Sequence, residues 1–137
     1  MSTLIKMVDF GIFIMIWLVQ LVVYPAFQYF THQELLQWHN QYTRGITVIV
    51  MPLMLGQLFL HGYQVFQLQT PTSVITLALV LAAWYITFIH AVPLHNKISM
   101  SSEIDSSIKS LLRFNLGRAL LWTAVLAMSI LIRTKAG

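Results

Sequence analysis

The chain has no cysteine, and only 9% of its 137 residues are charged. The missing cysteine excludes disulfides, thiolate metal sites and thiol redox chemistry. Soluble domains have about a quarter of their residues charged, so this chain has too little polar surface to cover a soluble domain. Acidic residues are especially rare, with four Asp and Glu in total. These shortages argue against a soluble globular protein and favour one that lies in a lipid bilayer.

Hydrophobic residues make up 58% of the chain, and they gather in four long segments. A helix needs roughly 20 apolar residues to cross a hydrocarbon core of about 30 Å. Because the four segments use nearly the whole chain, residues 1–137 are expected to form a single transmembrane domain. The fold class predicted is all-α, an integral membrane four-helix bundle with up-down-up-down topology. The spans are expected at about residues 10–27, 46–66, 73–94 and 114–132.

The eight Lys and Arg residues are scattered in ones and twos. Such a distribution fits topology signals and contacts with lipid headgroups, and it does not indicate nucleic-acid binding. The first apolar segment ends in the bulky YPAFQYF, not in the small residues of a cleavage site, so it is interpreted as a retained span. We expect a multi-pass protein of a bacterial-type inner membrane. Membrane lipids are its expected partners, together with further copies of the chain or a larger membrane complex.

A capping box predicts where the second helix begins. Thr31 is followed three residues later by Glu34. In a capping box the threonine oxygen accepts a hydrogen bond from the backbone N–H of the glutamate, and the glutamate side chain accepts one from the backbone N–H of the threonine. The helix should therefore start near His32 and continue into the second span. Within that span, Gln57 and His61 begin a polar stripe that Gln64 completes at helical spacing. Such a stripe must face protein, since lipid offers no hydrogen-bond partner, and we interpret His61 as a contact between helices.

The later helix ends carry further signals. Thr70 followed by Pro71 is the expected start of the third span. Pro93 should end or bend that span because proline lacks a backbone N–H. Ser102 and Asp105 form a second possible capping box before the fourth span.

Asp9 lies at the entrance of the first predicted span. No span is then expected to contain a carboxylate, and this argues against transport of protons or cations.

Polar side chains gather at one end of the predicted bundle, where the first and third spans finish and the second and fourth begin. Arg118 lies about one turn inside the fourth span and has no acidic residue at its depth. We expect Arg118 and Asn115 to polarise an oxygen of a substrate, and His90 or His39 to move a proton. The candidate ligand-binding residues at this end are Tyr24, Tyr42, Trp84, His95, Asn96, Arg113 and Trp122.

This pattern predicts a pocket at one membrane face for a lipophilic carbonyl or phenolic compound of the quinone type. The corresponding enzyme would be a cofactor-independent oxidoreductase, oxygenase or isomerase, and no metal is expected. Two alternatives stay open. Arginines near helix ends also reach lipid headgroups, so the chain could be a non-catalytic membrane subunit or a lipid-binding assembly partner. His39 or His95 could also share a haem with His90, although haem is only weakly supported.

Three short motifs point to a known group of proteins. They are YPAF ending the first span, VPLHNKI closing the third and RFNLGRALLW opening the fourth. In this layout the chain resembles the small four-helix membrane proteins of the anthrone-oxygenase-like family. The resemblance implies a membrane protein whose characterised relatives oxygenate a polycyclic anthrone to a quinone without a metal or flavin motif. The matched positions are Pro93, Asn96, Asn115 and Arg118, whereas His95 stands where an asparagine would be expected.

Overall fold

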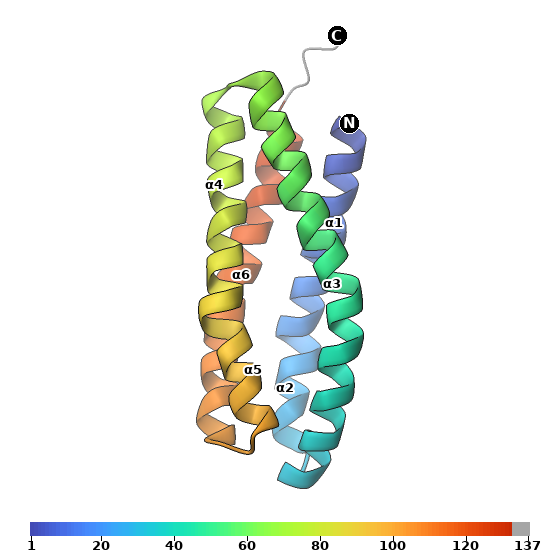
Figure 1. Ribbon diagram of the computed structural model, residues 1–137, viewed down its shortest axis with the longest axis vertical. Coiled ribbons are helices and arrows are strands. Elements are labelled where there is room, and N and C mark those ends of the chain that lie inside the picture. The colour runs from blue at the N-terminus through green and yellow to red at the C-terminus, as the bar shows by residue number, and fades with distance from the viewer. Residues whose placement is uncertain (133–137) are drawn as a thin grey trace.

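The computed structural model describes residues 1–132 and arranges them as four long antiparallel helical rods (Figure 1). Each rod is long and apolar enough to cross a membrane. The predicted all-α, up-down-up-down four-helix bundle is therefore confirmed. The first rod comprises α1 (Ser2–Leu18), η1 (Val19–Val23), α2 (Tyr24–Ala26) and η2 (Phe27–Tyr29). The second is α3 (His32–Leu68), the third is α4 (Pro71–Ile86), η3 (Thr87–Ala91) and α5 (Val92–Ser99), and the fourth is α6 (Ile104–Leu131).

The two ends of the bundle differ in what they contain (Figure 1). The N-terminus and the connection between α3 and α4 lie at one end, which we call the terminal end. The connections from the first rod to α3 and from α5 to α6 lie at the other, which we call the loop end. All four rods begin before the predicted spans, and the first three also extend beyond them, whereas the fourth ends at Leu131, within one residue of the prediction. The first starts at Ser2 instead of near residue 10, because the polar residues at the start of the chain do not interrupt it.

The predicted start of α3 is confirmed. The Thr31 hydroxyl accepts a hydrogen bond from the backbone N–H of Glu34 at 3.3 Å, and the Glu34 carboxylate accepts one from the Thr31 N–H at 3.0 Å. Thr70 caps α4 with Pro71 as its first residue, also as predicted.

The second predicted capping box is wrong. Glu103 precedes α6 in a left-handed conformation with φ 49°, and no side chain caps this helix. Ser102 instead donates its backbone N–H to the Lys97 carbonyl at 2.9 Å and so closes the end of α5. Ser102 therefore stabilises the end of α5 and does not cap the start of α6.

Each of the prolines near the loop end follows a π-helical turn. The turn η1 lies just before Pro25, and η3 lies just before Pro93. A proline ring clashes with the carbonyl four residues earlier, and a π turn opens the hydrogen-bond ladder at that position. Of the two alternatives expected for Pro93, that it ends the third span is wrong, because the rod continues in helical form to Ser99. Pro93 is instead accompanied by a local change of helix geometry, the π turn η3.

The bundle surface is apolar, as expected of helices that face lipid. Large side chains such as Val48 and Phe59 are 75% and 77% exposed. Inside, one apolar cluster lies toward the loop end around Phe27, Leu35 and Leu111. A second one fills the middle and the terminal half around Met54, Val80 and Trp122, and polar side chains lie between and beyond these two cores.

Candidate functional site

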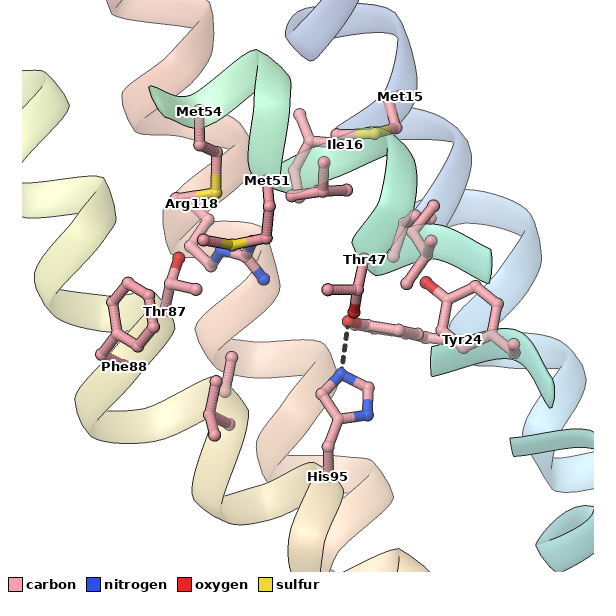
Figure 2. A pocket seen from close by; sticks show the side chains of 16 residues that line it. Met15, Ile16, Tyr24, Thr47, Met51, Met54, Thr87, Phe88, His95 and Arg118 are labelled. Carbon is pink, nitrogen blue, oxygen red and sulfur yellow. Dashed lines mark hydrogen bonds between the residues drawn. The ribbon is translucent and has the colours of Figure 1, made fainter. Parts of the chain in front are cut away.

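A cavity of about 250 Å³ lies between the rods in the loop-end half of the bundle (Figure 2). Most of its walls are apolar and come from α1, α3, η3 and α5. Three of its lining residues, Thr47, Phe88 and Val92, are also exposed at the surface of the bundle. The cavity therefore opens sideways, between α3 and the third rod. Its polar lining residues are Tyr24, Tyr42, Thr47, Thr87, His95 and Arg118.

Arg118 brings a positive charge into this apolar space. Its residue is only 6% exposed, and Figure 2 shows the guanidinium pointing from α6 into the cavity. Nη1 donates to the side-chain oxygen of Asn115 at 3.3 Å, and Cζ lies 5.0 Å from the centre of the Trp122 ring. Within residues 1–132 Arg118 forms no ion pair, and its Nε has no hydrogen-bond partner. A buried arginine without a carboxylate is costly and suits an oxygen-bearing ligand.

Asn115 lies behind Arg118 and does not line the cavity. It is fully buried, and its Nδ2 donates to the Gln20 side-chain oxygen at 2.9 Å. This bond leaves the Asn115 oxygen to face Arg118. Asn115 therefore orients the guanidinium from behind instead of facing a substrate itself.

A chain of hydrogen bonds leads from the cavity toward the loop end. The Tyr24 hydroxyl lies 2.9 Å from Nε2 of His95, as the dashed line in Figure 2 marks. Nδ1 of His95 lies 2.8 Å from Nε2 of His39, and Nδ1 of His39 lies 3.1 Å from the Ser99 hydroxyl. Ser99 is exposed at the end of α5. Since each neutral imidazole offers one donor and one acceptor, the whole chain can be satisfied in either direction.

His90, predicted as a proton carrier, does not line the cavity. Its half-buried ring stacks on Phe114, with the ring centres 4.0 Å apart and the planes 6° apart, and meets the edge of Tyr85. His95 occupies the position at the cavity that was expected for His90.

The other predicted ligand-binding residues divide into two groups. Tyr24, Tyr42 and His95 line the cavity, as expected. Trp84 does not line the cavity but stacks on Phe88, which does. Trp122 is buried behind Arg118 and does not line the cavity either. Asn96 and Arg113 are exposed and do not line the cavity.

The positions of His39, His90 and His95 do not fit a haem held by two of these histidines. The facing nitrogens of His39 and His95 lie 2.8 Å apart. Two imidazole nitrogens on opposite sides of a metal ion, each at about 2.0–2.1 Å, would lie about 4 Å apart. His90 faces Phe114 instead of either histidine. Among residues 1–132 no three His, Asp or Glu side chains gather as metal ligands.

A second polar cluster lies toward the terminal end and corrects the expectation for Asp9. Asp9 is 1% exposed, because α1 begins at Ser2 and encloses it in the bundle. Its carboxylate accepts hydrogen bonds from Gln57 at 2.7 Å and from the Ser129 hydroxyl, and it pairs with Nε2 of His61 at 3.0 Å. The expectation that no span contains a carboxylate is therefore wrong. The interpretation of His61 as a contact between helices is confirmed, with Asp9 as the partner that the sequence did not indicate.

Several site residues were missed because their side chains are not ionisable. Gln20 orients Asn115, while Met51 and Met54 form part of the cavity wall. Gln20 was detectable as a polar residue inside an apolar segment, whereas nothing distinguished the two methionines from lipid-facing ones.

No protein-family model matches the chain, and no curated protein or solved structure matches it significantly.

Proposed function

We propose that this protein binds a lipophilic carbonyl or phenolic compound of the quinone type, with an oxygen of the compound on Arg118. The observation that carries the proposal concerns Arg118, a residue that is 6% exposed and forms no ion pair among residues 1–132, and whose guanidinium points into an apolar cavity. Guanidinium N–H groups are strong donors in a dry site. A carbonyl or phenol oxygen would accept a hydrogen bond from the part of the guanidinium that Asn115 does not use, without the cost of burying a second full charge.

The size and the opening of the cavity support a ligand with an aromatic head and an apolar remainder. Sites for drug-sized ligands usually have about 300–1,000 Å³, and this cavity has about 250 Å³. It therefore suits a ring system of modest size. The sideways opening near Thr47 and Val92 would let an apolar tail extend into the surrounding lipid.

The hydrogen-bond chain from Tyr24 supports a role in proton exchange. Tyr24 lines the cavity and contacts His95, which contacts His39 in turn. With a phenolic or enolisable ligand, one proton would leave the ligand through Tyr24 and this histidine pair. The oxygen of the conjugate base would then pair with Arg118, whose charge stabilises it. The proposed chemistry needs only these side chains and is reversible, as in an isomerase or in the first step of an oxygenase.

Membership of the anthrone-oxygenase-like group and location in a bacterial-type inner membrane remain part of this proposal. Of the motif residues, Arg118 lines the cavity and Asn115 contacts Arg118 from behind, while Pro93 and Asn96 are not among the lining residues. The lateral opening also suits a phospholipid whose phosphate pairs with Arg118, so a lipid-binding subunit is the alternative that the test must separate.

Binding of a short-chain benzoquinone analogue to the protein in lipid nanodiscs tests the proposal, with tryptophan fluorescence as the signal. We expect saturable quenching in the wild type and an affinity at least about tenfold lower in Arg118→Gln, because one charged hydrogen bond is lost. Arg113→Gln is the matched control, since Arg113 lies on the same helix but is exposed.

Equal losses in both variants, or no saturable binding to the wild type, would refute the quinone-type ligand. Mass spectrometry of the extracted lipids supplies the second readout. Loss of one phospholipid class in Arg118→Gln alone would establish the lipid-binding alternative.

A further inference from the structure

We propose that Asp9 is a positioning residue for the ligand pocket, although it belongs to the other polar cluster. It would act through Gln57 and Trp122 on Arg118. The proposal rests on the function proposed above for the cavity, but its first test needs no ligand. The series runs from Asp9 through Gln57 and Trp122 to Arg118. Its first two links are hydrogen bonds, which depend on the atoms that donate and accept, and its third is a cation–π contact.

The first link decides how the Gln57 amide is turned. Asp9 and Gln57 are each 1% exposed, and Nε2 of Gln57 donates to Oδ1 of Asp9 at 2.7 Å. A carboxylate can only accept hydrogen bonds, so the NH₂ side of the amide must face it. The amide oxygen of Gln57 is thereby directed away from Asp9.

The second link uses that oxygen. Oε1 of Gln57 accepts a hydrogen bond from the indole N–H of Trp122 at 2.9 Å. The indole nitrogen is a donor only, so a turned amide would place two donors against each other. Asp9 therefore selects the one amide orientation that satisfies Trp122. The indole is 1% exposed, so water cannot replace the lost acceptor.

The third link is the support that Trp122 gives to the guanidinium. Cζ of Arg118 lies 5.0 Å from the centre of the Trp122 ring, within the range of a cation–π interaction. The guanidinium also donates a hydrogen bond to Asn115 at 3.3 Å, while Nε has no hydrogen-bond partner among residues 1–132. If the Trp122 ring tilted, the guanidinium of Arg118 would therefore no longer be held in the orientation that points into the cavity.

The other partners of Asp9 provide internal controls. His61 and Ser129 also contact the carboxylate and are 1% and 3% exposed. Their side chains make no hydrogen bond to Gln57, Trp122 or Arg118 in residues 1–132. If Asp9 only held helices together, removal of Gln57, His61 or Ser129 would change the pocket to a similar extent. If Asp9 positions Arg118, only the removal of Gln57 would change the pocket, and the removal of His61 or Ser129 would not.

The first experiment records the indole N–H signals of the ligand-free protein by NMR in detergent micelles. The chain has four tryptophans, and Trp122→Phe identifies the signal of Trp122. We expect this signal to shift in Asp9→Leu and in Gln57→Leu and to stay in place in Ser129→Ala. Gln57→Leu leaves Asp9, His61 and Ser129 intact, so it remains informative if Asp9→Leu fails to fold. An unmoved signal in Gln57→Leu, or equal shifts in all three variants, would overturn the proposal.

The second experiment measures affinity for the short-chain benzoquinone analogue in nanodiscs. Asp9→Leu and Gln57→Leu should each weaken binding by roughly tenfold, as expected for loss of one well-placed cation–π contact, and the double variant should lose no more than either alone. Asp9→Asn keeps an acceptor oxygen for Gln57 and should retain the wild-type affinity, whereas Ser129→Ala should leave it unchanged. Additive losses, or a loss in Asp9→Asn as large as in Asp9→Leu, would contradict the positioning role. If the wild type itself bound no quinone, the proposed function would fail, while the NMR result would still decide the link from Asp9 to Trp122.

Discussion

His39 and His95 meet inside the bundle with Nε2 and Nδ1 2.8 Å apart, although 56 residues separate them in the chain. The contact joins α3 to α5, and the two ring planes are inclined at 30°, with centres 5.0 Å apart. Tyr24 on one side and Ser99 on the other extend it from the cavity to the loop end. A histidine pair placed in this way is suited to pass a proton between a buried ligand and the aqueous surface.

The histidine pair predicts different roles for two residues of one segment. His95→Ala should slow the exchange of the acidic C–H of an anthrone-type probe for deuterium by roughly 10²–10⁴-fold, the usual contribution of a general acid or base. His90→Ala should leave the exchange rate unchanged, because His90 stacks on Phe114 outside the cavity. The rate is measured by NMR of the probe in heavy water. A fall in His90→Ala equal to that in His95→Ala would contradict the assignment.

Arg118→Met should stabilise the ligand-free protein by about 1 kcal/mol or more, even though it removes the proposed binding group. The reason is that a buried charge without an ion pair costs free energy that an apolar side chain of similar length does not. Unfolding in increasing SDS, followed by circular dichroism, measures the change. Met54→Ala is the reference for ordinary core damage, since Met54 is fully buried, and it should cost about 2–5 kcal/mol. Destabilisation of Arg118→Met to the same extent would show that Arg118 is structural.

Ala91→Leu should close the cavity. Ala91 lines it from the π turn η3 and is 2% exposed, so a larger side chain at this position must enter the empty volume. Affinity for the benzoquinone analogue is expected to fall at least about tenfold, since overlap of even a few atoms excludes the head group. Calorimetric titration in nanodiscs gives the affinity. The same substitution at Ala78, which is exposed on the third rod, should leave binding intact, and unchanged binding in Ala91→Leu would mean that the ligand binds elsewhere.

Thr31→Ala should destabilise the start of α3 by about 1 kcal/mol, because the capping box loses the hydroxyl that accepts the Glu34 N–H. Hydrogen exchange of the backbone amides at residues 32–36 should become faster, and exchange near Pro52 should not. Thr31→Ser keeps the hydroxyl and should behave like the wild type. Fast exchange in the wild type itself would contradict the capping contact.

Much of the fold could be predicted because its determinants are local. Thr31 with Glu34 and Thr70 with Pro71 act over three residues or fewer, and they start helices where expected. The polar residues Gln57 and His61 had to face protein wherever the neighbouring helices lay. Their burial at 1% exposure each agrees with that rule.

The candidate site was predicted in location but not in its members. His90 and His95 lie in the same rod, and helical periodicity placed His90 on the inner face with Thr87. The cavity residues of this rod instead include Thr87, Ala91 and His95, at a spacing of four, together with Phe88 and Val92 beside them. This spacing exceeds the 3.6 residues of an α-helical turn, because the π turn η3 changes the rotational phase before Pro93. Sequence periodicity alone assumed an uninterrupted α-helix.

By itself, the sequence determined that this protein is an all-helical bundle suited to a membrane, with Arg44, Arg113, Arg118 and most histidines toward one end. These properties follow from apolar length and from the cost of unpaired polar groups in lipid, which depend only on neighbouring residues. The tertiary structure alone decided that Asp9 meets His61 and that His39 meets His95, across 52 and 56 residues. It also decided that Arg118 faces a cavity. Such contacts depend on the rotation of each helix about its axis. This rotation is determined jointly by the π turns and by packing against the neighbouring helices.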